Sequence, residues 1–482
     1  MTKRKKKRSP VRLALRGLRW FILLLLLYNI IGGYLPFALR PSLEDPAAIE
    51  ARADAMQRDI DTADRAMILE TRLSALDERI RLMNQAQEEL IIATYDCRDG
   101  ESTRDILSVA LDRADAGVQV RLLMDGIAGR IMSLDARFRA FAAHPNVEVR
   151  FYNPAQPFMA WKHMGRMHDK YVIADDRAYI LGGRNMIDHF IGEYHSPSPS
   201  RDREALVYNG AHGTDKSGES SLFQVRGYFE TVWAQPTTSV YAPTLRAERR
   251  DAVCAELRAR VDAIRADKPS LFEAADYAAM TEETRGVWLV SNPTTIYAKQ
   301  PVVFSTLCAL MRRAESDVVI HSPYAVLSPA MRETLSGIAA RVPVTLMINA
   351  VENGDNFVAS SDYLYHKPEV LSTGVRLMEY AGGDSYHGKS MAIDDDIAII
   401  GSYNLDLRST YVDTELMLVI RSRAVNAQLR ANMEALHADC RQVIDMDTAI
   451  EPRTVEIPPV PFLKKCALYL NGALMQLVRN LV

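Results

Sequence analysis

The sequence predicts an α/β protein built from two similar halves in one chain, with a membrane-spanning helix near the amino terminus. Three observations support this fold class. An 18-residue segment that begins at His168 returns in similar form at His387. Around both copies, short apolar runs alternate with amphipathic segments in the same order, as in sheets flanked by helices. A stretch of 20 residues, 20–39, contains no charged side chain.

Length and composition are those of a globular protein with two domain-sized units. The chain has 482 residues, of which 48% are hydrophobic and 25% are charged, so it can bury a large core. The five cysteines are scattered and show no metal-ligand spacing, which argues against a disulfide framework and a zinc site. They stand at positions 97, 254, 308, 440 and 466.

Basic charge is concentrated at the amino terminus. Residues 1–19 carry nine Lys or Arg and no acidic residue, whereas the remainder of the chain carries a net charge of −12. Nucleic-acid enzymes usually carry a basic footprint on their folded part. The acidic body therefore argues against a nucleic-acid partner, although a local basic groove could exist within it.

The uncharged stretch 20–39 is the candidate membrane anchor. As a helix it would extend roughly 30 Å, enough to cross the hydrocarbon core of a bilayer. Because the nine cations precede it, the positive-inside tendency places the amino terminus in the cytoplasm and the body on the other side. A cleaved signal peptide is one alternative, but no A-x-A site follows promptly. A buried or interfacial helix is the other.

The first half begins with a predicted helical region, 47–87, whose apolar stripe has helical spacing. Alternating strands and helices follow, and they lead to the motif segment 167–181. The predicted strands cover 89–95, 118–125 and 147–152, and the predicted helices cover 102–116 and 133–143.

The second half repeats this order of elements. Predicted strands cover 317–324, 344–350 and 375–380, and a predicted helix covers 328–340. Strands that alternate with helices imply a largely parallel or mixed sheet in each half.

The chain accordingly divides into five parts, of which the two lobes are the largest. The connector between the lobes is predicted to hold one helix near 246–265. The carboxyl-terminal part is apolar with three cations, and it would either lie on a membrane surface or dock on the body as a terminal helix. The five parts are the basic terminus and anchor (1–45), the first lobe (46–240), the connector (241–285), the second lobe (286–447) and the carboxyl-terminal extension (448–482).

The repeated segment has the pattern HxKxxxxD, and an Asn follows 17 positions after the His in both copies. His168 and Lys170 are two positions apart, as are His387 and Lys389. On a strand, each pair would point to one face, so imidazole and ammonium could meet the same ligand.

The other positions of the repeat have different expected roles. Asp175 and Asp394 fall at an odd offset near the strand end, and they are expected to brace the motif rather than touch substrate. The two asparagines follow a Gly-Gly or Gly-Ser turn, where the backbone can approach an anion closely and the amide can donate. These turn residues and amides are Gly183 with Asn185, and Ser402 with Asn404.

Brought together, the two halves would place two imidazoles, two ammonium groups and two amides around one cavity. This set suits a phosphodiester, because one neutral His can attack phosphorus while the other, protonated, gives its proton to the leaving alcohol. The Lys and Asn pairs would hold the phosphate oxygens and stabilise the transition state. No metal or other cofactor is required, and no HExxH or clustered-carboxylate pattern suggests one. A single His near a strand is usually structural, but two copies with equal internal spacing favour a functional site.

The doubled HxKxxxxD motif resembles the signature of the phospholipase D superfamily, and the resemblance covers roughly residues 68–445. It implies two pseudo-symmetric α/β/α lobes with one site at their interface, with His168 as the nucleophile and His387 as the acid. Within the superfamily, the segments around both motifs look most like bacterial cardiolipin synthases, especially the C type. By the same resemblance, Glu204 and Glu415 would hold the two catalytic imidazoles and fix their tautomers.

The resemblance implies a membrane-anchored phosphatidyltransferase that works through a phosphohistidine intermediate. Its substrates would be phospholipids, with phosphatidylglycerol as the first candidate and phosphatidylethanolamine as the second. The catalytic body would lie on the outer, periplasmic side of a bacterial inner membrane. The alternatives are a phospholipase D that hydrolyses phospholipid to phosphatidic acid, a nuclease of the same fold, and a non-enzymatic scaffold with relic motifs. The acceptor alcohol is left open, because the segment 349–370 follows the family's arrangement only loosely.

Overall fold

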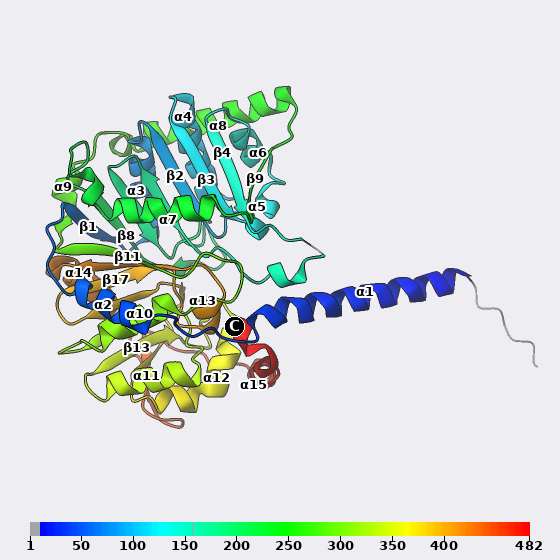
Figure 1. Ribbon diagram of the computed structural model, residues 1–482, viewed down its shortest axis with the longest axis vertical. Helices are drawn as coiled ribbons and strands as arrows, with labels where there is room; N and C mark the ends of the chain where they lie inside the picture. Colours follow the sequence, from blue (N-terminus) through cyan, green and yellow to red (C-terminus); the bar gives the residue numbers. More distant parts are fainter. Residues whose placement is uncertain (1–9, 157) are drawn as a thin grey trace, which may run out of the picture.

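The computed structural model describes residues 10–156 and 158–482, and it consists of two stacked lobes with one long helix extending from the body (Figure 1). Each lobe is built around a nine-stranded mixed sheet. The predicted α/β fold class with two similar lobes is therefore confirmed. Residues 1–9, which hold six of the nine amino-terminal cations, lie outside the described part of the chain.

In the first lobe the strand order is β10-β1-β8-β6-β5-β2-β3-β4-β9. Strands β2, β3 and β4 run parallel, and the other neighbours are antiparallel. Parallel neighbours need crossover connections, which the amphipathic helices between them provide. The strands are β1 (Asp64–Leu69), β2 (Glu89–Thr94), β3 (Gln119–Asp125), β4 (Val147–Tyr152), β5 (Tyr171–Ala174), β6 (Ala178–Gly182), β8 (Glu204–Asn209), β9 (Thr238–Val240) and β10 (Glu282–Glu283).

The second sheet repeats this arrangement in the order β11-β18-β17-β16-β12-β13-β14-β19-β20. Its β12, β13 and β14 are again the parallel strands. Strands β16 and β17 follow the His and Lys of the second motif as β5 and β6 follow those of the first, so the repeat in sequence is a repeat in topology. The strands are β11 (Gly286–Ser291), β12 (Val318–His321), β13 (Val344–Asn349), β14 (Arg376–Tyr380), β16 (Ser390–Ile393), β17 (Ile397–Gly401), β18 (Leu416–Arg421), β19 (Cys440–Val443) and β20 (Ala449–Ile450).

Three large apolar cores hold these layers together, beside one small cluster of six buried residues in the second lobe. The first lies between one face of the first sheet and α3, α4, α6 and α8, and the second lies between one face of the second sheet and α2, α10, α11 and α12. The third combines residues of both sheets with α7 and α14 and so joins the lobes. The helices are α2 (Pro46–Met56), α3 (Arg72–Asn84), α4 (Glu101–Asp115), α6 (Ala136–Ala142), α7 (Leu222–Trp233), α8 (Ala247–Asp267), α10 (Val302–Met311), α11 (Pro329–Ala339), α12 (Phe357–Leu371) and α14 (Arg423–His437).

The long helix α1 (Pro10–Tyr34) carries the candidate anchor. With the short helix η1 (Leu35–Phe37) it forms a run, 11–37, that is long and apolar enough to cross a membrane, and little of it is buried against the body. Figure 1 shows α1 projecting from the body, with only its carboxyl-terminal end close to the lobes.

The predicted helical region 47–87 is wrong in its middle. Strand β1 separates α2 from α3 within it. All six residues of β1 pair with β8. Pairing with a distant strand thus decides the conformation of this short segment, as is common where local propensity is weak.

The predicted start of the first lobe at residue 46 is also wrong. Ile49, Ala53 and Met56 share one face of α2 and are buried in the core of the second lobe. Glu50 accepts hydrogen bonds from Arg312 and Arg313 of that lobe. The chain therefore passes over the second lobe before it enters the first sheet.

The predicted connector, 241–285, belongs to the first lobe. Its helix α8 packs against α4 and α6, and its strand β10 pairs with β1 at the sheet edge. The carboxyl-terminal extension holds α15 (Phe462–Met475), which docks on α12 of the second lobe. Docking is close at Gly472, where an added Cβ would lie 2.6 Å from the carbonyl oxygen of Ser361.

The two motif aspartates lie at the turn between paired strands, where both have a left-handed backbone, with φ of 50° at Asp175 and 48° at Asp394. The Asp175 carboxylate accepts from the backbone N–H groups of residues 87–89. The Asp394 carboxylate accepts from those of residues 315–317. Each aspartate thus links the turn after its strand to the segment that leads into the neighbouring strand. Both lie at the strand end away from the His.

Replacing Asp394 by Ala should lower the free energy of unfolding by about 1–3 kcal/mol, because three backbone donors lose a charged acceptor. Chemical unfolding followed by tryptophan fluorescence measures the change. The exposed neighbour Asp395 is the matched control, and Asp395→Ala should shift stability by less than about 0.5 kcal/mol. Equal losses in the two variants would contradict the bracing role.

Candidate active site

The two motif segments meet at the interface of the lobes, and each is held by the opposite lobe. The backbone N–H of His168 donates to Thr414 Oγ1 at 3.1 Å, and that of His387 donates to the carbonyl oxygen of Arg201 at 2.6 Å. The His and Lys residues precede β5 and β16 and do not lie on strands. The prediction that His and Lys share a strand face is therefore wrong. The carbonyl oxygens of Lys170 and Lys389 still accept from Gly182 and Gly401 at 3.3 and 3.2 Å, but the His backbone N–H groups bond across the interface instead.

Short backbone pairings fix this arrangement on both sides. β7 (Ser200–Arg201) pairs in parallel with β15 (Ser385–Tyr386), and Met167 forms an isolated parallel bridge with Thr414. In each case the segment just before a motif His lies against the segment that carries a carboxylate in the other lobe. The pseudo-symmetry of the lobes thus extends to their contact.

His168 is oriented by Glu415 of the second lobe. Its Nδ1 lies 2.9 Å from Glu415 Oε1, so a proton on Nδ1 is donated to the carboxylate and Nε2 keeps its lone pair. The same carboxylate accepts from the hydroxyls of Ser402 at 2.5 Å and Ser409 at 2.6 Å. These donors hold Glu415 in place within a fully buried setting.

His387 is oriented by Asp202 of the first lobe. Its Nδ1 lies 2.6 Å from Asp202 Oδ2, and the backbone N–H of Arg203 donates to Asp202 Oδ1 at 2.7 Å. An added Cβ at Gly183 would lie 2.4 Å from Asp202 Oδ1. Gly183 therefore makes room for this carboxylate, where its counterpart in the second lobe supplies a hydroxyl.

The prediction that Glu204 holds an imidazole is wrong. The Glu204 carboxylate is fully buried and pairs with Arg79, with one contact of 2.5 Å, while Arg184 Nε lies 3.7 Å away. A buried carboxylate paired in this way serves the lobe's own core. Asp202, which the sequence argument missed, contacts His387 instead.

The strand register shows why Asp202 is the counterpart of Glu415. Gly182 faces Glu204 across the ladder, whereas the equivalent Gly401 faces the residue two positions after Glu415. The matching carboxylate in the first lobe therefore stands two positions before Glu204. Asp202 could have been found from the sequence by aligning the apolar residues of the two strands with each other. Aligning the acidic residue that directly precedes each strand leads to Glu204 instead.

The two motif lysines are buried beside the imidazoles. Lys170 Nζ donates to the carbonyl oxygen of His168 at 2.5 Å and lies 5.0 Å from the centre of the Tyr95 ring. Lys389 Nζ lies 2.6 Å from Nδ1 and 3.0 Å from Nε2 of His387. Because Nδ1 faces Asp202, Nε2 is the ring atom that can accept from this ammonium.

Burial sets the charge of these basic groups. It lowers the pKa of Lys170 to about 7 and that of Lys389 to about 8, against the opposing effect of the nearby carboxylates. Burial and the two ammonium groups hold the pKa of His168 well below its usual value. Burial and Lys389 also lower the pKa of His387, which Asp202 opposes. Both imidazoles are therefore neutral near pH 7.

The two orienting carboxylates differ in their electrostatics. Burial raises the pKa of Glu415 well above its usual value, although Lys170 and two hydroxyls oppose the rise. Burial also acts on Asp202, but Lys389 and His387 outweigh it and lower the pKa of Asp202. An ionised Asp202 favours a proton on His387 more than Glu415 favours one on His168.

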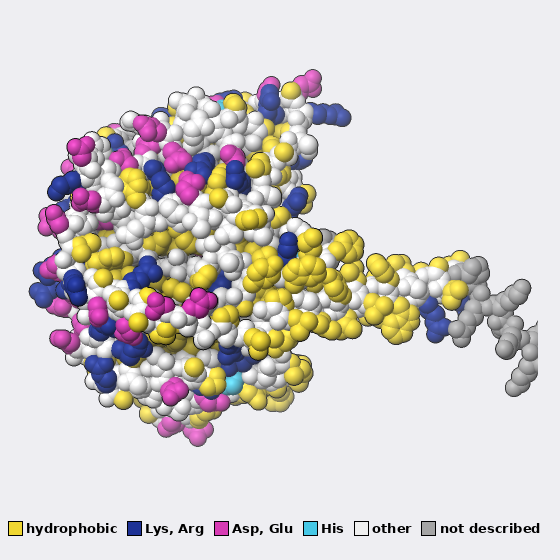
Figure 2. Space-filling view, in the orientation of Figure 1, with side chains coloured by type: hydrophobic (Ala, Val, Ile, Leu, Met, Phe, Trp, Pro, Cys, Tyr) yellow, Lys and Arg dark blue, Asp and Glu magenta, His cyan; other side chains and the backbone are white. Residues whose placement is uncertain are grey.

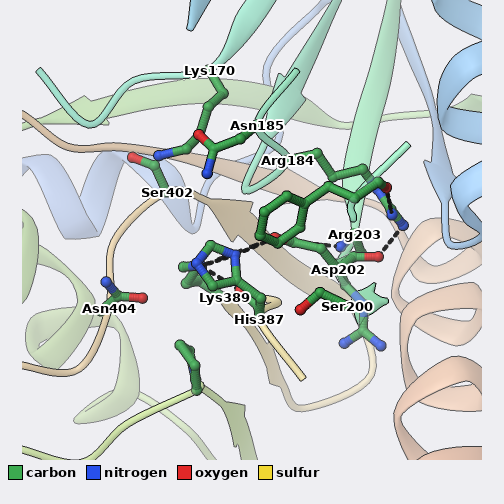
Figure 3. A network of polar contacts seen from close by, with 12 residues as sticks. Lys170, Arg184, Asn185, Ser200, Asp202, Arg203, His387, Lys389, Ser402 and Asn404 are labelled. Atoms are coloured by element: carbon green, nitrogen blue, oxygen red, sulfur yellow. Dashed lines mark hydrogen bonds and ion pairs between the residues drawn. The ribbon is translucent and has the colours of Figure 1, made fainter. Parts of the chain in front are cut away.

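The motif amides complete the site. Asn185 Oδ1 accepts from the backbone N–H of Asp96 at 3.2 Å, and its NH2 group, which has no hydrogen-bond partner among the described residues, can donate to a ligand. Figure 3 shows Lys170 with Asn185 and Ser402 on one side, and His387 with Lys389 and Asp202 on the other. Asn404 is also nearly buried beside the second group. The assembly offers two neutral imidazoles and several cationic or N–H donors, which suits attack on an anionic phosphodiester.

Comparison with known proteins identifies the family to which the chain belongs. The family described as "Cardiolipin synthase, PLD-like domain" matches residues 80–191 and 307–437, just over half of the chain. Cardiolipin synthase C of Escherichia coli K12 is 26% identical over 402 residues, covering 75% of this chain and 82% of that protein. An uncharacterised protein of Helicobacter pylori is 23% identical over 414 residues, covering 77% of this chain and 78% of that protein.

Among solved structures, phosphatidylserine synthase of Haemophilus influenzae has the same fold. It matches with a TM-score of 0.63 at 13% sequence identity, covering 90% of this chain and all of that one. The doubled motif, the bilobal fold and the matched segments agree on one assignment. The chain belongs to the phospholipase D superfamily, within the family of cardiolipin synthase-type domains, and it is an enzyme.

Proposed function

We propose that this protein is a membrane-anchored phosphatidyltransferase of the cardiolipin synthase type, which moves a phosphatidyl group to a lipid alcohol through a phosphohistidine intermediate. The observation that carries the proposal is the crossed pairing of His168 with Glu415 and of His387 with Asp202. It supplies two neutral imidazoles with defined tautomers at one site. The names of the related cardiolipin synthases support a phospholipid substrate. We propose phosphatidylglycerol as the first candidate and phosphatidylethanolamine as the second.

In the first step, Nε2 of His168 attacks the phosphorus of the donor lipid. A P–N bond forms, the P–O bond to the headgroup alcohol breaks, and the departing oxygen takes a proton from Nε2 of His387. Because His387 is neutral in the free enzyme, it takes up a proton from solvent as the anionic substrate binds. The arriving phosphodiester anion and the ionised Asp202 both raise its proton affinity.

In the second step, His387 acts as the base. Its Nε2 takes the proton of the acceptor hydroxyl, the acceptor oxygen attacks phosphorus, and the P–N bond to His168 breaks. His387 is then protonated again, as it was when the first step began. With a lipid alcohol as acceptor the product is a phosphodiester, and with water it is phosphatidic acid.

The buried cations and amides stabilise the charge on phosphorus in both steps. Lys170 and Lys389 stand within reach of the imidazoles, and their ammonium groups gain from an anionic neighbour because burial has lowered their pKa values. The NH2 group of Asn185 adds a neutral donor. These groups need no reorganisation when charge develops, since the surrounding fold already holds them.

We propose further that α1 crosses the bacterial inner membrane, with the amino terminus in the cytoplasm and the catalytic body on the outer side. The length and apolar composition of the run 11–37 support the span. The nine cations before residue 20 support the orientation. An anchored body meets both lipid substrates at the surface where they reside.

Full-length protein given phosphatidylglycerol vesicles, with and without phosphatidylethanolamine, should form cardiolipin. His168→Ala and His387→Ala should each reduce the rate by at least about 10³-fold. The first removes the nucleophile that attacks phosphorus, and the second removes the group that transfers the proton. Chromatographic separation of radiolabelled lipids measures the products. Phosphatidic acid as the sole product would replace the transferase assignment by hydrolysis, and equal rates in wild type and variants would refute both.

The rate should fall as pH rises towards about 9, because His387, whose pKa is lowered, loses the proton that the leaving alcohol needs, and because Lys170 and Lys389 lose the protons that hold the phosphate between about 7 and 9. On the acid side the rate should persist to well below pH 6.5, since the pKa of His168 is lowered and the nucleophile stays neutral. A pH–rate profile of kcat/KM tests both limbs. Lys389→Arg should extend the alkaline limb whatever its absolute rate, because a guanidinium stays charged. A profile that rises from pH 7 to 9 would contradict the assigned roles.

Asp202→Asn should lower kcat by about 10²–10⁴-fold with little loss of stability, because it removes the charge that fixes the tautomer of His387. Glu204→Gln should lower the thermal midpoint instead, because it breaks the buried ion pair with Arg79. The kcat of the folded variant should stay within a few-fold of the wild-type value. Activity and thermal unfolding of the two variants are measured side by side. A larger kcat loss for Glu204→Gln would reverse the assignment of the carboxylate.

A further inference from the structure

The carboxyl-terminal helix α15 carries an apolar stripe on its outer side as well as on its inner one. Leu468 and Gly472 face α12 and are buried. On the opposite side, the large side chains recur every three to seven positions and stand in solvent. These are Leu463 (80% exposed), Leu470 (64%) and Leu474 (58%) on α15, and Leu477 (77%) on the short helix η5 (Gln476–Leu481) that follows it. A helix that is apolar on both sides is expected inside a protein or a membrane rather than in water.

A second apolar group lies on the loop that precedes the first motif. Phe158 is 72% exposed, and Met159 and Trp161 are also exposed. These three residues and the four leucines of the outer stripe are called the apolar rim. Figure 2 shows hydrophobic side chains gathered around the base of α1, where this end of the body lies.

The apolar rim is continuous with the end of the candidate anchor. Tyr28 donates its hydroxyl proton to the carbonyl oxygen of Phe158 at 2.8 Å, and an added Cβ at Gly32 would lie 2.7 Å from the Cβ of Ala160. An apolar groove of about 490 Å³ lies between α1 and Trp161. On the other side, the Asn480 side chain donates to the carbonyl oxygen of Ala38 at 2.9 Å. The helix end, the loop and the carboxyl terminus thus form one surface.

We infer that the apolar rim is inserted into the bilayer leaflet from which α1 emerges, so that α15 lies in the membrane interface as a second contact beside the anchor. This inference rests on the anchoring proposed above. Once α1 spans a bilayer, the leaflet begins at the helix end, where the rim is attached. Lys464 and Lys465 are exposed at the start of α15 and suit an anionic lipid surface. A second copy of the chain would have to cover the rim without displacing the lipid around α1.

The rim is connected to the catalytic site through the loop 158–166. Arg408 donates to the carbonyl oxygen of Met164 at 2.8 Å, and the backbone N–H of Arg166 donates to Asp413 at 3.1 Å. Trp161 stands seven positions before His168. A bilayer that holds Trp161 therefore also fixes the height of the nucleophile above the acyl chains.

Cys466 provides a native reporter for this inference. Of the five cysteines, all of which fall in the described residues, the other four are buried and Cys466 is exposed on α15. Full-length protein labelled there with a polarity-sensitive maleimide dye is reconstituted into phosphatidylglycerol/phosphatidylethanolamine vesicles. The emission should shift to the blue, and lipids with a nitroxide near the headgroup should quench it more than soluble iodide does. Such a pattern corresponds to burial about 5–10 Å deep.

Matched variants separate a specific contact from the mere presence of the anchor. Leu470→Glu with Leu474→Glu should abolish quenching by the nitroxide lipid while α1 keeps the protein in the vesicle. Ile60→Glu is the control, because Ile60 is exposed in the segment between α2 and β1, away from α1 (Figure 1). It should keep the quenching, and both variants should retain the wild-type thermal midpoint.

Two outcomes would overturn the inference. A dye that stays open to iodide in vesicles shows that α15 remains in water. Shielding from both quenchers, together with efficient cross-linking between Cys466 residues of two chains, assigns the rim to a dimer. Lipid products are measured on the same vesicles. Quenching without product formation would leave the rim in the membrane and reject the proposed transferase, so the two failures are distinguishable.

Discussion

The crossed pairing of imidazole and carboxylate is the constraint on which the rest of the molecule depends. His168 is held by a carboxylate of the second lobe, and His387 by one of the first. A buried charge without a partner is costly, so neither lobe can bury its carboxylate well until the other has docked. The apolar core shared by the two sheets supplies the favourable free energy of docking. The short pairings around Thr414 and Arg201 then fix the register in which the polar groups meet.

Predictions from the sequence agree with the structure for features that depend on local patterns or on the internal repeat. The doubled motif, the alternation of strands and helices and the apolar run near the amino terminus each appear in the structure where they were expected. The failures are long-range. β1 is a strand because it pairs with β8, and α2 belongs to the second lobe because its apolar face finds a core there. Neither partner can be identified from the segment itself. Asp202 was missed for a related reason, since only the strand register, and not its place before an apolar run, makes it the counterpart of Glu415.

The two halves of the site are similar in geometry but unequal in chemistry. A Ser at position 402 donates to Glu415, whereas Gly183 at the matching position only makes space for Asp202. Glu415 accepts from two hydroxyls and has a raised pKa, whereas Asp202 lies near Lys389 and has a lowered pKa. Proton affinity thus differs between two imidazoles that occupy equivalent places in equivalent folds. This inequality supports assigning attack on phosphorus to one and proton transfer to the other.

The exchange of carboxylates between the lobes also bears on why both are carried by one chain. A single half, on its own, would hold a histidine without its acid and an acid without its histidine. Two identical halves related by a twofold axis would satisfy both, because each would give the other what it lacks. In such a symmetric dimer both carboxylates would belong to the same residue, and the two imidazoles would have equal proton affinities. When both halves are in one chain, the two carboxylates can be different residues. In one chain, the carboxylate that each half places against the other half's histidine can differ from the one that contacts its own histidine. The two halves do differ in this way, with Asp202 in the first and Glu415 in the second.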